Sequence, residues 1–140
     1  MVLKSKSVVL RASLIASGIV VLDQISKLQA SNVTSNPGVG LGLAAQYISQ
    51  PMVVVLTLFI LFALWFFARD WWQRFPYAAG LFCGGALSNM LDRVFFGGVR
   101  DWLEVPVFGL RNNFADWAIF LSLIWILRTT LVRAAQKETT

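Results

Sequence analysis

The chain contains four long stretches of mainly apolar residues, separated by shorter polar segments. Within each stretch the apolar residues follow one another without the alternation that half-buried strands show, and this favours helices. A helix needs roughly 20 mainly apolar residues to cross the hydrocarbon core of a bilayer. The pattern therefore predicts four transmembrane helices, at Ser7–Gln29, Pro51–Ala68, Pro76–Leu91 and Phe114–Val132.

Two segments join these helices at one end, and both differ from the short connection at the other end. Ser31–Gln50 is rich in Gly, Ser, Asn and Ala, and Gly98–Asn112 has short runs of Trp, Val and Phe around Pro106 and Gly109. Such runs on either side of turn residues are typical of a strand pair. We expect a small strand-rich platform here, within a single four-helix domain that covers residues 1–140.

Composition places the chain among membrane proteins. Of the 140 residues, 57% are hydrophobic and 14% are charged, which is more apolar than a soluble domain of this size can bury. The predicted fold class is therefore an all-α membrane protein with membrane lipids around it. The net charge of +5 is typical of topology signals beside an anionic leaflet, so we expect no nucleic-acid partner.

The distribution of Lys and Arg predicts the orientation of the helices. Four spans put both termini on one side of the membrane, and cytoplasmic segments carry an excess of Lys and Arg. The terminal side holds eight of the 12 cations and the platform side holds four, so both termini are expected in the cytoplasm. The eight are Lys4, Lys6, Arg11, Arg69, Arg74, Arg128, Arg133 and Lys137, and the four are Lys27, Arg93, Arg100 and Arg111.

The acidic residues gather at the opposite end from most of the cations. Of seven Asp and Glu residues, only Asp70 and Glu138 fall on the terminal side. An ionisable side chain near hydrocarbon costs a few kcal/mol or more, which makes the others candidates for a functional site. The alternative is that they are solvated loop acids and helix caps. The five are Asp23, Asp92, Asp101, Glu104 and Asp116.

Spacing along the helices suggests how such a site is built. Asn89 and Asp92 stand three residues apart, as do Asn113 and Asp116, so each amide and carboxyl share a helical face. This symmetry favours Asp92 and Asp116 as facing carboxyl groups. Two facing carboxyl groups in a partly dry site do not both ionise easily, so one can act as a general base on water while the other stays protonated.

Residue types that are rare or missing exclude several kinds of catalytic site. The chain has no His and one cysteine, Cys83, in an apolar run. Without His there is no Ser-His or Cys-His nucleophile pair, and the commonest metal ligand is missing. We expect Cys83 to be a small buried hydrophobic residue. Carboxylates are thus the best-placed catalysts, and neither a metal nor a cofactor is expected.

Five short motifs occur in an order that resembles the lipoprotein signal peptidases, also called signal peptidase II. The resemblance implies four transmembrane helices, a small outer β platform and no cofactor. It implies an aspartic endopeptidase of the bacterial cytoplasmic (inner) membrane, with its site at the outer face. The substrates would be diacylglyceryl-modified prolipoproteins, cut just before the lipidated cysteine. The motifs are Asp23-Gln24-Ile25-Ser26-Lys27, Asn36-Pro37-Gly38, Gly84-Gly85-Ala86-Leu87-Ser88-Asn89-Met90-Leu91-Asp92-Arg93, Gly98-Val99-Arg100-Asp101 and Asn113-Phe114-Ala115-Asp116.

The resemblance also implies roles for single residues. It makes Asp101 and Asp116 the catalytic pair, in place of the Asp92 and Asp116 that the spacing favours. The residues implied to bind substrate or support the pair are Asn36, Gly38, Asn89, Arg93 and Asn113, and those implied to be structural are Asp23, Lys27 and Asp92. Lys27 stands four residues after Asp23, where the two can pair on one helix.

Three residues depart from the family pattern and keep other functions open. Arg100 stands before the first implied catalytic Asp where an apolar residue is usual, Asn112 stands in place of Phe, and Trp117 stands in place of a small hydroxyl residue. One alternative is a non-catalytic relative that binds lipidated signal peptides. Another is a small transporter with an acidic vestibule, since intramembrane acids are also typical of transporters.

The cation distribution generates a test of the topology. In a Cys83→Ala background, Glu104→Cys should react with an impermeant thiol reagent added to intact spheroplasts. Gln136→Cys should react only after lysis, because its side of the membrane carries the cation excess. The reverse labelling pattern would reject the predicted orientation.

Overall fold

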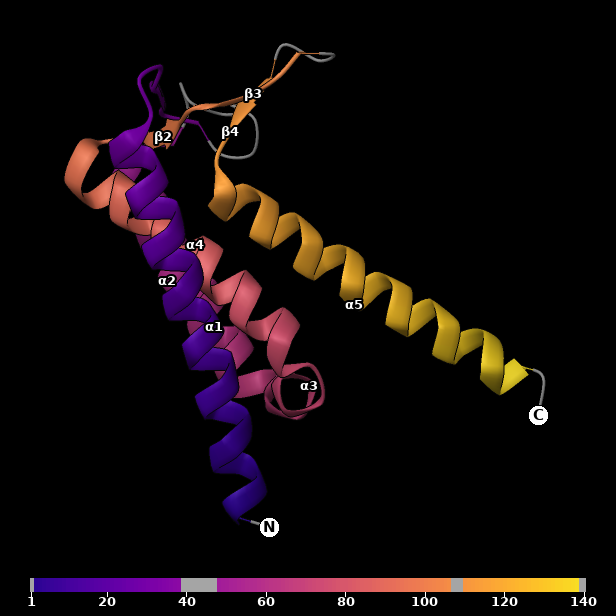
Figure 1. The fold of residues 1–140 in the computed structure, drawn as a ribbon. Coiled ribbons are helices and arrows are strands. Elements are labelled where there is room, and N and C mark those ends of the chain that lie inside the picture. The colour runs from indigo at the N-terminus through magenta and orange to yellow at the C-terminus, as the bar shows by residue number, and fades with distance from the viewer. Residues whose placement is uncertain (1, 39–47, 107–109, 139–140) are drawn as a thin grey trace.

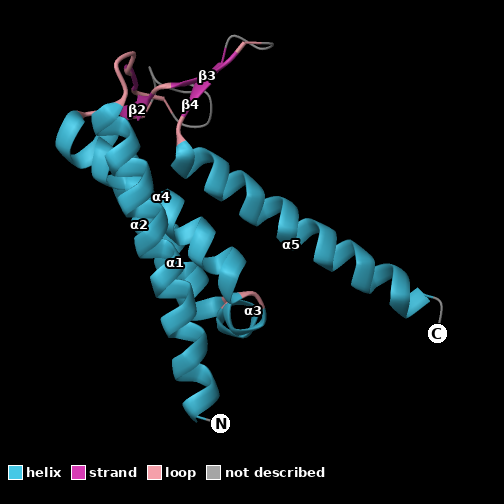
Figure 2. Cartoon of the chain, viewed as in Figure 1, coloured by secondary structure: helices cyan, strands magenta, loops and turns pink. Residues whose placement is uncertain are grey.

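The computed structural model describes residues 2–38, 48–106 and 110–138, and these form a mostly helical chain (Figure 1). Figure 2 shows that the strands gather at one end of the helices, away from the start of α1 and the end of α5. We call this the strand end. The helices are α1 (Val2–Gln29), α2 (Gln50–Phe67), α3 (Arg69–Arg74), α4 (Pro76–Phe96) and α5 (Phe114–Glu138).

Three helices in the described part of the chain are long and apolar enough to cross a membrane. These candidate spans are Lys6–Gln29, Gln50–Phe67 and Phe114–Gln136. The third predicted span corresponds to α4, which is not among these candidates and which carries several glycines as well as Asn89 and Asp92. The coarse prediction of a helical membrane protein is confirmed, and the number of spans stays a prediction.

The strand end contains two small antiparallel sheets. Strand β3 (Leu103–Val105) pairs with β4 (Leu110–Asn112), as the turn residues between them predict. The predicted turn around Gly109 lies outside the described residues. Strand β1 (Thr34–Asn36) pairs with β2 (Val99–Asp101), and the sequence did not predict this sheet. The pairing brings the segment after α1 against the segment after α4.

Several helix boundaries differ from the predicted spans. The described helix α1 begins before Ser7, and α4 continues past Leu91 to Phe96, so that Asp92 lies inside the helix. Helix α4 ends at Gly97, whose φ of 70° is left-handed backbone that glycine adopts without strain. The short helix α3 was not predicted. Helix α4 continues through Asp92 and Arg93 because tertiary contacts at the strand end satisfy their side chains.

Helix α4 lies at the centre of the packing and uses glycines to approach both neighbours. Gly80 and Gly84 lie against the α1 backbone, where a Cβ atom would meet the carbonyl oxygens of Ala12 and Ala16 at 2.7 Å. Gly85 lies against α5, and its Cβ would meet the Ala115 carbonyl oxygen at 2.5 Å. Small residues let helix backbones approach closely in a membrane. The glycine stripe therefore fixes α1 and α5 on two sides of α4.

The remaining core follows the same rule. The buried hydrophobic residues are small, whereas Phe, Leu and Trp side chains face outward on α2 and α5. This distribution suits a protein whose surroundings are lipid, because lipid tails solvate large apolar side chains. The buried hydrophobic residues are Val53, Ala78, Ala79, Val99, Ala115 and Ala118. Cys83, expected to be buried, is half-buried.

The contact between Gly85 and α5 predicts the effect of adding one methyl group. Gly85→Ala should lower the free energy of unfolding by about 1–3 kcal/mol, because overpacking displaces Ala115. Gly18→Ala is the matched control on α1, since nothing lies within 4 Å of its added Cβ. Thermal unfolding in detergent should show a lower midpoint for Gly85→Ala alone. Equal midpoints for the two variants would contradict the packing described here.

Candidate active site

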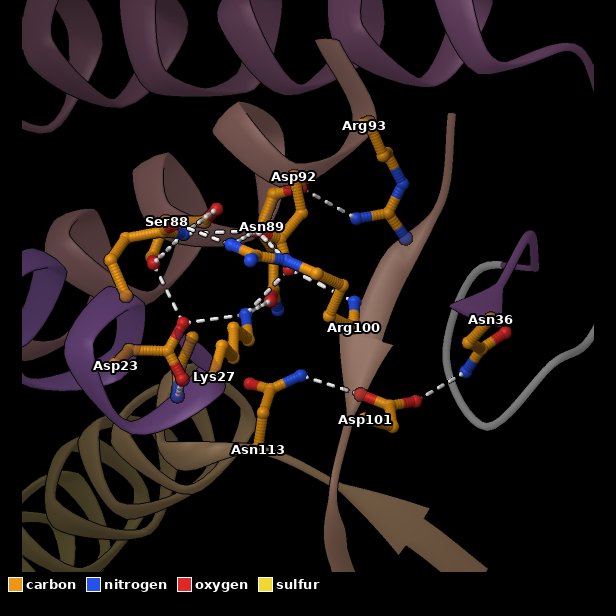
Figure 3. A network of polar contacts seen from close by, with 12 residues as sticks. Asp23, Lys27, Asn36, Ser88, Asn89, Asp92, Arg93, Arg100, Asp101 and Asn113 are labelled. Carbon is orange, nitrogen blue, oxygen red and sulfur yellow. Dashed lines mark hydrogen bonds and ion pairs between the residues drawn. The ribbon is translucent and has the colours of Figure 1, made fainter. Parts of the chain in front are cut away.

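Polar side chains from α1, β1, α4, β2 and the start of α5 converge at the strand end (Figure 3). Each lies at or near the end of its element, where the chain turns from apolar to polar sequence. Several are completely or almost completely buried, so their charges and hydrogen-bonding groups must find partners within the protein. The buried polar residues in this region are Asp23, Lys27, Ser88, Asn89, Asp92, Asp101 and Asn113.

Asp101, the last residue of β2, lies between two asparagine side chains (Figure 3). Asn113 Nδ2 donates to its Oδ1 at 2.6 Å, and Asn36 Nδ2 donates to its Oδ2 at 3.0 Å. Both amides are turned by contacts of their own oxygens, with Asp116 N–H and Gly38 N–H respectively. The two oxygens of the Asp101 carboxylate are therefore each aimed at a fixed donor.

Asp116 lies in the first turn of α5 and is linked to Asp101 through Asn113. The side chain of Asn113 donates to Asp101 and accepts from the Asp116 backbone N–H at 2.9 Å. Asn89 Nδ2 donates to Asp116 Oδ1 at 2.8 Å. The two carboxylates lie near enough for the charge of one to act on the other. One asparagine, Asn113, thus links the Asp101 carboxylate to the backbone of Asp116.

The environment of Asp101 opposes its ionisation. Burial raises the pKa of Asp101 above its ordinary value, and this effect exceeds the opposing effects of its surroundings. The hydrogen bonds from Asn36 and Asn113 and the positive charges of Lys27 and Arg93 all favour the ionised form. A carboxyl group in such a balance can change protonation state during a reaction.

Lys27 is the centre of a buried charged cluster behind the two carboxylates. Its Nζ lies 2.5 Å from Asp23 Oδ2 and 2.8 Å from Asp92 Oδ2, and it donates to Asn89 Oδ1 at 3.3 Å. The contact with Asp23 is the one expected from their i, i+4 spacing. Asp23 Oδ1 in turn accepts the backbone N–H of Ala115 at 3.0 Å. The cluster therefore joins α1, α4 and the first turn of α5.

Asp92 is enclosed by donors and cations. Gln24 Nε2 donates to its Oδ1 at 2.9 Å, while Lys27 and Arg100 both form ion pairs with its carboxylate. Ser88 Oγ donates to Asp23 at 2.7 Å and accepts from Gln24 at 3.0 Å. A carboxylate held by two cations is fixed in its charged form. This arrangement suits a supporting residue better than one that exchanges protons.

The segment after β1 is held over the site by Arg93 and Gln50. Arg93 Nη2 donates to the Gly38 carbonyl oxygen at 2.9 Å, and its Nη1 donates to the Asn89 carbonyl oxygen at 3.2 Å. Gln50 Nε2 donates to the Pro37 carbonyl oxygen at 2.5 Å. These contacts place the Asn36 amide beside Asp101, so Arg93 supports the site from α4.

All the residues to which the sequence assigned a role in the site lie in this region. Glu104, the fifth acidic residue on this side of the chain, lies outside it. Glu104 is exposed and pairs with Arg111 at 3.4 Å. Gln24 and Ser88 were not assigned a role from the sequence. Their polar side chains in mainly apolar helices could have marked them as candidates for the site. Gln50 gave no such signal, because it lies at the start of α2 like an ordinary polar residue at a helix end. In the described part of the chain, no group of three His, Cys, Asp or Glu could hold a metal.

Solved structures of similar shape place the fold in a class, the bacterial membrane enzymes. One structure described as a bacterial membrane enzyme matches with a TM-score of 0.77 and 27% sequence identity, over 90% of each chain. A second with the same description matches with a TM-score of 0.68 and 28% identity, over 86% of this chain and 92% of the other. The chain thus shares its fold with proteins described as bacterial membrane enzymes.

Sequence comparison narrows the class to one family. The family model for signal peptidase (SPase) II matches residues 15–132. A lipoprotein signal peptidase of Desulfitobacterium hafniense (strain DSM 10664 / DCB-2) is 33% identical over 106 residues, which are 74% of this chain and 68% of that protein. One of Staphylococcus aureus (strain MRSA252) is 27% identical, over 89% of this chain and 90% of that protein. The chain belongs to the signal peptidase II family, which is a family of proteases.

The buried cluster predicts a large stability loss for Asp92→Asn. The substitution leaves Lys27 and Arg100 with one carboxylate fewer, and breaking a buried ion pair typically costs about 3–5 kcal/mol. Thermal unfolding in detergent should show a clear drop in midpoint. Glu104→Gln is the matched control, because its exposed pair with Arg111 contributes at most about 1 kcal/mol. Similar midpoints for the two variants would contradict the cluster's role.

Asp101→Asn should behave differently, because burial raises the pKa of Asp101 in the folded state. A raised folded pKa contributes stability that is present below the unfolded pKa and is lost as pH rises through the folded pKa. Asparagine does not titrate. The midpoint of Asp101→Asn should therefore rise relative to the wild-type midpoint as pH increases through this range. A difference that is constant with pH, or that falls, would refute the assignment.

Proposed function

We propose that this chain is an aspartic endopeptidase that removes the signal peptide from diacylglyceryl-modified prolipoproteins, cutting just before the lipidated cysteine. Asp101 and Asp116 are its catalytic residues. The observation that carries this proposal is the shared contact of Asn113, which holds the Asp101 carboxylate and the Asp116 backbone together. Membership of the signal peptidase II family supports the reaction class. No cofactor takes part.

The chemistry follows from two carboxyl groups that share one proton. In a partly dry site the second ionisation is opposed by the first, so one group is charged while the other keeps its proton. The charged group removes a proton from water, whose oxygen attacks the scissile carbonyl carbon. The protonated group donates a hydrogen bond to the carbonyl oxygen. When the tetrahedral intermediate collapses, the carbon–nitrogen bond breaks and a proton passes to the leaving amine.

Three further residues fix the geometry of this reaction. Asn89 orients Asp116 from α4, and Asn36 orients Asp101 from β1. Arg93 holds the Gly38 carbonyl and so keeps the segment after β1 beside the site. Bound substrate would lie beside Pro37 and Gly38, next to the Asn36 amide that donates to Asp101. Such positioning by neighbouring residues is worth several kcal/mol in a reaction of this kind.

The orientation of the protein suits this substrate. We propose that α4 is a fourth span, that both termini are cytoplasmic, and that the strand end faces outward from the bacterial cytoplasmic membrane. The cation excess on the terminal side supports this orientation. A lipidated cysteine at the outer leaflet keeps its acyl chains in the bilayer. The outward-facing apolar side chains of α5, Phe120 and Leu121 among them, give those chains an apolar surface beside Asp116.

The two alternative functions are weaker. A small transporter would need polar groups along its helices, whereas the buried polar residues of the described chain gather mainly at the strand end. A non-catalytic relative that only binds lipidated signal peptides would not need two carboxyl groups that are each held by asparagine side chains. The similarity to proteins named lipoprotein signal peptidase favours catalysis over both.

Removing either proton-exchanging group should abolish cleavage. Asp101→Asn and Asp116→Asn should each lower kcat by at least about 10²- to 10⁴-fold, because an amide cannot exchange the required proton. The measurement is release of the signal peptide from a purified lipidated prolipoprotein, followed by mass spectrometry. Circular dichroism of each variant in detergent would verify that the helices remain folded.

Two other carboxylate variants make this test specific. Glu104→Gln should cleave at the wild-type rate, because Glu104 is exposed and lies outside the site. Asp92→Asn should lose stability, and its remaining folded fraction should still cleave. A dead, folded Asp92→Asn together with an active Asp101→Asn would show that the catalytic pair is Asp92 and Asp116.

A further inference from the structure

Arg100 immediately precedes Asp101 and takes no part in the chemistry described above, yet its side chain enters the buried cluster (Figure 3). Its Nη2 lies 2.8 Å from Asp92 Oδ1 and donates to Gln24 Oε1 at 2.6 Å. Its Nε donates to Asp92 Oδ1 at 3.2 Å. Only 12% of the Arg100 side chain is exposed. The guanidinium group therefore links β2 to α4 and α1 at once.

Two more contacts hold the same residue on α4. The backbone N–H of Arg100 donates to Asp92 Oδ2 at 2.9 Å, so one carboxylate binds both its main chain and its side chain. The guanidinium carbon lies 3.9 Å from the centre of the Phe96 ring, a cation–π contact one helical turn beyond Asp92. Together these contacts fix the position of β2 along the end of α4.

The strand needs such an anchor because its own sheet is small. Strands β1 and β2 have three residues each, and within the described residues they pair only with one another. An isolated two-stranded sheet is marginally stable. Successive side chains of a strand point to opposite faces. When Arg100 is directed toward Asp92, the next side chain, Asp101, is directed away from the cluster and toward Asn113. The anchor of one residue thus sets the orientation of the other.

Charge balance makes the anchor specific for a cation. Asp23 and Asp92 share the buried Lys27, and Arg100 supplies the second positive charge. Without it, two carboxylates would share one ammonium group in a site with little access to water, and an unbalanced buried charge is costly. An apolar residue at this position would keep the backbone hydrogen bond to Asp92 but would lose every side-chain contact that joins the strand to α4 and α1.

We propose that Arg100 is a positioning residue for the reaction, which fixes β2 on α4 and so directs the Asp101 carboxylate into the catalytic pair. This inference rests on the proposed function. Arg100 acts through Asp92 and the strand backbone, and it does not touch the substrate. Its removal should therefore slow the chemical step while leaving substrate binding almost unchanged.

Kinetics of three purified variants test this role. Arg100→Met should lower kcat at least about tenfold with KM within about twofold, because a small displacement of a catalytic group strongly slows the chemical step. Arg100→Lys should recover part of the lost kcat, since it restores the charge but not the three side-chain contacts. Arg111→Met is the matched control on β4, whose exposed pair with Glu104 should make it indistinguishable from wild type. Thermal unfolding identifies the temperature at which every variant is fully folded for the assay.

Two results would overturn the proposal. One is a folded Arg100→Met variant with kcat within twofold of wild type. The other is a variant whose loss appears mainly in KM, or is not relieved by Arg100→Lys, because a positioning role predicts neither. Wild-type chain that fails to cleave, alongside an equally inactive Asp101→Asn, would instead count against the proposed function itself.

Amide hydrogen exchange tests the anchor without any substrate. Peptides that cover residues 99–102 should exchange at least about tenfold faster in Arg100→Met, because the strand loses its side-chain contacts with α4. Peptides that cover 110–113 should exchange at the wild-type rate and serve as the internal control. Unchanged exchange at 99–102 would overturn the inference, whatever the activity assay shows.

Discussion

The arrangement of the site depends on one buried ammonium group. Lys27 is 2% exposed, and a charge in that position is tolerated only with partners in good geometry. Its partners, Asp23, Asp92 and Asn89, come from α1 and α4, and Asp23 also binds the first turn of α5. Any relative shift of these helices would break an ion pair or leave a buried charge unbalanced. The cluster therefore fixes three helices beside the proposed catalytic residues.

The glycines of α4 and the charged cluster both fix the positions of α1 and α5, through different interactions. Gly84 and Gly85 set how closely α1 and α5 approach α4, through backbone contact that a methyl group would prevent. The cluster then sets the register of those helices, because ion pairs and hydrogen bonds are directional. The amides of Asn89 and Asn113 connect this cluster to Asp116 and Asp101, the proposed catalytic pair. Rigid packing is what allows a buried carboxyl group such as Asp101 to be held in an unfavourable environment.

Much of the fold could be predicted from the sequence because a bilayer dictates the length and polarity of a span. The β3–β4 hairpin was predictable from its turn residues, whereas β1 was not, since Thr34–Asn36 has little strand character and pairs with β2 only through tertiary contact. The gathering of acids at one end was visible from the helix boundaries. Their partners were not, because long side chains such as Arg100 and Gln24 reach across elements, and spacing along one helix carries no information about such contacts.

The central claim is that Asp101 and Asp116 share one proton during catalysis, and the pH dependence of kcat/KM tests it most directly. A pair that works with one group charged and one protonated loses activity at both extremes, so the profile of the wild-type protein should be bell-shaped. Both limbs should belong to the pair, in which burial raises the pKa of Asp101 above its ordinary value. A profile that rises once with pH and stays level, as a single carboxylate base would give, would contradict the account.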